Sequence, residues 1–77
     1  MISKRDLKDH EFTNIEEYFE YIVNSQVNGQ FTQVQNLINE LSSNQKKDAL
    51  DYISNLYAPD NTPDYVNKVQ SKILESI

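Results

Sequence analysis

The sequence predicts an all-α protein, a compact bundle of three to four short helices built on an αα-hairpin. Between Thr13 and Leu56 the apolar residues recur every three to four positions, which is the period of a helix with one buried face. Asn28-Gly29 and Ser42-Ser43 interrupt this rhythm where a helix would end. The 77 residues fit a single helical domain, 1–77. A domain of this size buries only about 60% of the surface that its unfolded chain exposes, so we expect modest stability.

The first strong helix is predicted over residues 14–28. Thr13 and Glu16 have the spacing of a capping box, in which the Thr hydroxyl and the Glu carboxylate each accept a hydrogen bond from a backbone amide. Gly29 is expected to adopt the left-handed conformation that closes the helix. The apolar stripe of this helix contains Ile15, Tyr18, Phe19, Ile22, Val23 and Val27, with Gln26 on the same face.

Two further helices are predicted in the middle of the chain. Residues 30–41 follow the first helix with almost no linker, so this segment should turn back against it as an αα-hairpin. Residues 44–57 should form the next helix, with Ser42 or Ser43 as its cap. The predicted buried faces are Phe31, Val34, Leu37, Ile38 and Leu41 in the first of these helices, and Ala49, Leu50, Ile53, Leu56 and Tyr57 in the second.

A last helix is predicted over residues 63–77, after a break at Ala58-Pro59-Asp60-Asn61. Thr62 and Pro63 suit its N-cap and its first helical position. At the other end of the chain, residues 1–12 are expected to form an arm or a short helix anchored by Ile2 or Leu7. The last helix should bury Val66, Val69, Ile73 and Ile77. The core as a whole is expected to include Phe19, Ile22, Phe31, Val34, Ile38, Leu50, Ile53, Leu56, Val69 and Ile73.

The residue inventory argues against an enzyme, a cofactor site or a metal site. The chain has no Cys and a single His, so it lacks the usual ligands of transition metals and a Cys nucleophile. Gly29 is the only glycine, which excludes a glycine-rich phosphate-binding loop. Near the N-terminus we expect a solvated charged cluster, not a cation site, at Asp6, Asp9, His10 and Glu11.

Charge narrows the range of partners. Seven Lys and Arg against twelve Asp and Glu give a net charge of −5, and residues 30–45 contain no Lys or Arg. Direct binding of nucleic acid is therefore not expected, because phosphate contacts supply most of its non-specific affinity. We expect no membrane association either, because no apolar run approaches the length of a membrane-spanning helix.

Two outward surfaces are candidates for binding a partner protein. The first consists of Glu17, Glu20, Tyr21 and Asn24, on the side of the first helix opposite its apolar stripe. A Tyr among unpaired carboxylates suits a basic partner, although Tyr21 could equally cover a neighbouring helix. The alternative surface is polar and uncharged, and consists of Gln33, Asn36 and Asn39 on the following helix.

Three runs within residues 13–57 place two amphipathic helices around an Asn-Gly-Gln turn: Ile15-Glu16-Glu17-Tyr18-Phe19-Glu20-Tyr21-Ile22, then Asn28-Gly29-Gln30-Phe31 with Gln33 and Gln35, then Leu41-Ser42 followed by Gln45-Lys46-Lys47. In these runs the chain resembles small, mostly uncharacterised helical proteins encoded by tailed bacteriophages. The resemblance implies a protein made in the cytoplasm of the infected bacterium, where it would inhibit or redirect a host protein or defence complex. It assigns no functional residues.

Two functions stay open at the level of sequence. The first is an acidic protein-binding module whose partner is a host protein. The alternative is a role related to nucleic acid, as a DNA mimic or a small transcription regulator. In either case a second copy of the chain could add stability by forming a homo-oligomer.

Overall fold

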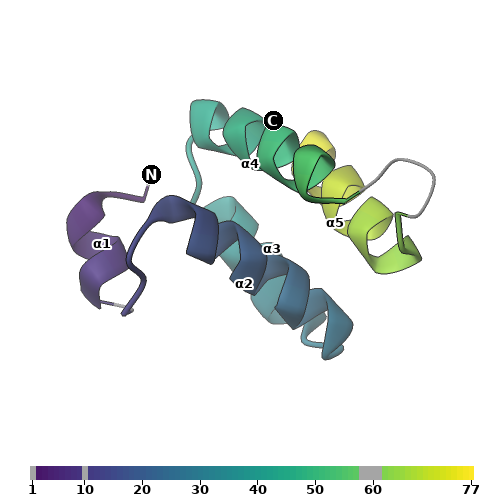
Figure 1. The fold of residues 1–77 in the computed structure, drawn as a ribbon, viewed down its shortest axis with the longest axis horizontal. Helices are drawn as coiled ribbons and strands as arrows, with labels where there is room; N and C mark the ends of the chain where they lie inside the picture. The colour runs from purple at the N-terminus through teal and green to yellow at the C-terminus, as the bar shows by residue number, and fades with distance from the viewer. Residues whose placement is uncertain (1, 10, 58–61) are drawn as a thin grey trace.

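Five helices account for most of the chain that the computed structural model describes, namely residues 2–9, 11–57 and 62–77 (Figure 1). The predicted break at Ala58-Pro59-Asp60-Asn61 lies outside the described residues. No strand occurs in the described ranges, so the predicted all-α class is confirmed. The helices are α1 (Lys4–Asp9), α2 (Ile15–Val27), α3 (Phe31–Asn39), α4 (Ser43–Leu56) and α5 (Asp64–Glu75).

Helix α2 is the centre of the fold, because it packs against each of the other four helices. In Figure 1, α3 lies alongside α2, the α4–α5 pair lies on the other side of the molecule, and α1 lies near the start of α2. The apolar stripe predicted for this helix faces inward, with Tyr18, Phe19, Ile22 and Val23 buried. One side of α2 is therefore buried and the other is exposed, as the helical period of its apolar residues predicts.

The hydrophobic core contains most of the residues predicted for it. Ile2 and Leu7 are also buried, so both of the suggested anchors hold the N-terminal segment. Seven of the predicted core residues are almost completely excluded from solvent: Phe19, Ile22, Val34, Ile38, Ile53, Val69 and Ile73.

The prediction of burial was wrong at the ends of several helices. Phe31 is 56% exposed and Leu56 is 45% exposed, while Leu50 is only partly buried against the core. Phe31 is the first residue of α3 and Leu56 is the last residue of α4, so each lies at the end of the apolar face of its helix, where less of the side chain is covered. At Phe31 the covering group is a cation, because the Lys72 ammonium lies 5.0 Å from the ring centroid. Val27 and Ile77 are exposed for the same positional reason.

Two helix caps lie one residue away from their predicted positions. Asn14, not Thr13, caps α2, since its side-chain oxygen accepts a hydrogen bond from the Glu17 amide at 3.0 Å. The Glu17 carboxylate reaches back to the Thr13 amide at 3.0 Å, so Glu17 takes the reciprocal role predicted for Glu16. At α5 the N-cap is Pro63 in an extended conformation, where Thr62 was predicted.

The short helix α1 is tied to α4 by one side chain. Gln45 accepts from the Ile2 amide at 2.9 Å and donates to the Ile2 carbonyl at 2.6 Å. The same Gln45 oxygen accepts from the amide of Ser42, which caps α4 as predicted and completes a capping box. Residues 43 positions apart are therefore joined through a side chain that also defines the start of α4.

Gly29 closes α2 in the left-handed region, with a φ of 76°, as predicted. The Gln30 amide donates to the Ser25 carbonyl at 2.9 Å and the Gly29 amide donates to the Gln26 carbonyl at 3.2 Å. These two hydrogen bonds form a Schellman motif, which satisfies carbonyls that the end of the helix would otherwise leave unpaired.

A side chain at position 29 should destabilise the protein only through the positive φ of this residue. A Cβ at this position would meet nothing within 4 Å, so only the backbone opposes a side chain. We expect Gly29→Val to lower the free energy of unfolding by about 1 to 2 kcal/mol. Gly29→Asn should lower it less, because Asn tolerates the left-handed region. Asn28→Ala should also lower it less, because residue 28 has a negative φ. Urea denaturation followed by circular dichroism measures the difference. A Gly29→Val variant as stable as the wild type would contradict the left-handed cap.

Candidate functional site

The four residues predicted as an acidic surface line one hollow on the outer side of α2. Glu17, Glu20, Tyr21 and Asn24 are joined there by Phe12 from the connection between α1 and α2, and by Leu56 and Tyr57 from the end of α4. The hollow has a volume of about 410 Å³. We call this set of seven residues the acidic groove.

The groove exists because of the helical period of α2. Positions 17, 20, 21 and 24 recur every three to four residues and lie on one side, while the buried positions occupy the other. Glu20 and Asn24 are exposed, Glu17 is partly buried, and the Tyr21 ring is 40% exposed. The packing of α2 therefore leaves two carboxylates, an amide and an aromatic ring available to a partner.

Tyr21 is held in place by contacts on two sides. Its ring meets the Phe12 ring edge to face, with centroids 5.6 Å apart. Its hydroxyl accepts a hydrogen bond of 2.7 Å from the Gln33 side chain on α3. The same Gln33 amide also donates to the Ser25 hydroxyl at 3.0 Å, and that hydroxyl donates to the Tyr21 carbonyl at 2.9 Å. Tyr21 is thus a fixed ring with an exposed face, and its contact with Gln33 places it against α3, which is one of the two roles considered for it in the sequence.

The alternative amide surface does not form one continuous site. Gln33 is engaged with Tyr21 and lines a second hollow of about 330 Å³ that includes Tyr21, Leu37 and Glu40. Asn39 accepts a hydrogen bond from Gln35 at 3.1 Å, and Asn36 and Asn39 are exposed. Gln33 therefore contacts Tyr21 of the acidic groove, whereas Asn36 and Asn39 line neither of these two hollows.

The pKa values of Tyr52, in α4, and Tyr57, at the end of α4, are raised by burial and by nearby carboxylates. Partial burial raises the pKa of Tyr52, and the Glu20 and Glu16 carboxylates raise it further. Burial also raises the pKa of Tyr57, with additional contributions from Tyr65 and Glu20. A nearby negative charge disfavours the phenolate, so the protonated form of both rings persists to higher pH. Glu20 is the one carboxylate that both rings share.

Phe12, Leu56 and Tyr57 are members of the groove that the sequence did not predict. Leu56 and Tyr57 were assigned to the buried face of their helix, and Phe12 precedes the first predicted cap and belongs to no stripe. Phe12 packs edge to face against Tyr18 and Tyr21, with centroids 5.7 Å and 5.6 Å away. An aromatic residue just before a helix cap was the available signal, since such residues often pack back onto the first turns.

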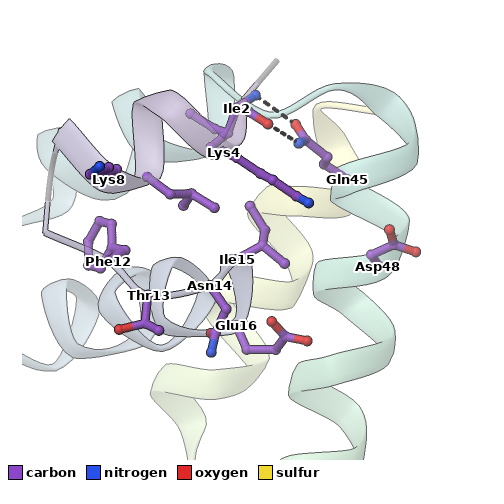
Figure 2. A pocket seen from close by; sticks show the side chains of 11 residues that line it. Ile2, Lys4, Lys8, Phe12, Thr13, Asn14, Ile15, Glu16, Gln45 and Asp48 are labelled. Atoms are coloured by element: carbon purple, nitrogen blue, oxygen red, sulfur yellow. Dashed lines mark hydrogen bonds between the residues drawn. The ribbon is translucent and has the colours of Figure 1, made fainter.

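A larger hollow, of about 770 Å³, lies between α1, the start of α2 and the start of α4 (Figure 2). We call it the α1 cavity. Its apolar lining is Ile2, Leu7, Phe12 and Ile15, and its polar lining is Lys4, Lys8, Thr13, Asn14, Glu16, Gln45 and Asp48. The sequence did not predict this cavity.

The remaining chemistry of the described residues is limited. No group of three or more His, Asp or Glu side chains in the described ranges is arranged to hold a metal ion, and His10 lies outside those ranges. Among the described helices, none combines the length and the apolar character that a membrane crossing requires.

No protein-family model, curated protein or solved structure matches the chain. The function is therefore inferred from the geometry and charge of the acidic groove.

Removing the charge of Glu20 should lower the pKa of the two tyrosines beside it. Glu20→Gln keeps an acceptor oxygen but loses the negative charge, so the pKa of Tyr52 and of Tyr57 should fall toward the ordinary value of about 10. NMR of ¹³C-labelled Tyr during an alkaline titration resolves each ring. Glu75→Gln, at the exposed end of α5, is the matched control and should leave both values unchanged. Unchanged values in Glu20→Gln would contradict the electrostatic account of the groove.

Proposed function

We propose that the protein is a small acidic binding module that attaches to a host protein through the acidic groove. The observation that carries this proposal is the convergence of Glu17, Glu20, Tyr21 and Asn24 on one hollow beside the exposed side chain of Leu56. The groove therefore offers an aromatic ring of the kind enriched at the centres of protein interfaces, together with carboxylates that give charge complementarity to a basic partner.

The chemistry of the groove suggests the kind of surface that it would recognise. Glu17 and Glu20 would pair with Lys or Arg side chains of the partner. The rings of Tyr21 and Tyr57 offer faces on which an Arg guanidinium can stack. Leu56 would contact an apolar side chain at the same place. A basic segment with one apolar anchor is thus the partner that fits best.

The phage-like pattern of residues 13–57 supports a more specific proposal about biology. We infer that the protein is made by a tailed bacteriophage and acts in the cytoplasm of the infected bacterium, where it inhibits or modulates a host protein or defence complex. Binding alone suffices for such a role, which needs no catalytic residues.

The role as a DNA mimic or transcription regulator has less support. A mimic needs carboxylates spread over much of its surface, whereas the chain has a net charge of only −5. Helix α3, which would have to read DNA in a regulator, contains no Lys or Arg.

Charge reversal in the groove tests the proposed function. Glu20→Lys combined with Asn24→Lys places two cations in the groove at two exposed positions. Asn67→Lys combined with Glu75→Lys makes the same change in charge on exposed positions of α5. All three proteins are used to capture binding partners from a lysate of the host bacterium, after circular dichroism has established that they fold equally.

We expect a captured host protein to be retained by the wild type and by the α5 variant, and to be reduced at least tenfold with the groove variant. A tenfold loss corresponds to about 1.4 kcal/mol, a modest value for charges at the centre of an interface. Equal retention by all three proteins, or retention of no protein by the wild type, would contradict the proposed function.

A further inference from the structure

The α1 cavity, at about 770 Å³, is larger than the acidic groove, with which it shares only Phe12, and it has no part in the function proposed above. Its volume of about 770 Å³ falls within the range of about 300 to 1,000 Å³ that is typical of small-molecule sites. Its walls come from three elements, α1, the start of α2 and the start of α4. Figure 2 shows Lys4 and Ile15 pointing toward the space between these elements.

The apolar lining suits a hydrocarbon body. Leu7 and Ile2 are almost completely buried, and Phe12 and Ile15 are partly buried against the core. These four side chains are the apolar part of the cavity lining. A bound hydrocarbon would remove their exposed parts from water, which is favourable in proportion to the area covered.

The polar lining carries two cations and two carboxylates, and one of the cations reaches across the opening of the cavity. Figure 2 shows Lys4 extending from α1 across the opening of the cavity, and Lys8 lies on the same helix at its other end. Two carboxylates, Glu16 and Asp48, lie at the edge of the cavity on α2 and α4.

One of these carboxylates is partly offset by the helix that carries it. Glu16 is in the first turn of α2, where the positive end of the helix favours a negative charge, whereas Asp48 is in the second turn of α4, beyond the reach of that effect. The caps of these helices are already occupied by Asn14 and Ser42. Lys4 is therefore the group best placed to pair with an anion that enters the cavity.

We infer that the α1 cavity binds a small amphipathic anion, with a hydrocarbon body against Leu7, Phe12 and Ile15 and a carboxylate on the Lys4 ammonium. Medium-chain alkanoates are the simplest molecules of this class.

A comparison of head groups on one hydrocarbon chain tests the inference. Decanoate, decanol and decylamine, each below the concentration at which it forms micelles, are titrated into the full chain and followed by amide and methyl NMR. Decanoate should bind saturably and at least threefold more tightly than decanol, and decylamine should bind most weakly. The largest shifts should fall on Leu7, Phe12 and Ile15.

A matched pair of variants identifies the head-group contact. Lys4→Gln should weaken decanoate binding by roughly three- to tenfold, the range expected for the loss of one hydrogen-bonded contact, and should leave decanol binding unchanged. Lys47→Gln, at an exposed position of α4 outside the cavity lining, should leave both affinities unchanged.

Several results would overturn the inference. They are an absence of saturable decanoate binding to the wild type, equal affinity for decylamine, largest shifts at Tyr21, Asn24 and Leu56, which line the acidic groove but not the α1 cavity, and decanoate binding that Lys4→Gln leaves unchanged. None of these results bears on the capture of a host protein through the acidic groove, so the two proposals fail independently.

Discussion

Burial of one side of α2 is the constraint on which the rest of the structure depends. This helix contacts all four of the others, so its inward residues serve several interfaces at once. Ile22 is completely buried, and Tyr18 and Phe19 are almost completely buried. A chain of this size has little core to spare, and these side chains cannot be exchanged for polar ones without loss of the fold. The residues on the opposite side of α2 do not have to be apolar, and four of them line the acidic groove.

Polar contacts between α2, α3 and α5 give the bundle its specific arrangement. Gln33 joins the hydroxyls of Tyr21 and Ser25, and the Lys72 ammonium donates to the side-chain oxygen of Gln26 at 2.8 Å. Ser25 and Gln26 are buried, and no buried side-chain nitrogen or oxygen in the described residues lacks a hydrogen-bond partner. Satisfied polar contacts of this kind fix the register of packed helices. They also fix the position of the Tyr21 ring, which would lower the entropy cost of the partner binding proposed for this ring.

The sequence predicted what depends on neighbouring residues and missed what depends on distant ones. The left-handed Gly29 and the buried face of α2 follow from local spacing, and so does the clustering of Glu17, Glu20, Tyr21 and Asn24. The exposure of Phe31 and Leu56 depends on where neighbouring helices end, which periodicity does not contain. The shift of the α2 cap from Thr13 to Asn14 reflects a choice between two adjacent residues that both can cap. The α1 cavity could not be predicted, because Gln45 brings residues 43 positions apart together to form it.

The central claim is that one side of α2 folds the protein and the other side binds a partner. Photo-cross-linking in cells of the proposed host tests it most directly, with a photoreactive amino acid placed either at Asn24, in the acidic groove, or at Asn67, on the exposed side of α5. The account predicts a discrete cross-linked product with one host protein from position 24 and none from position 67. The same product from both positions, or a product from position 67 alone, would contradict it.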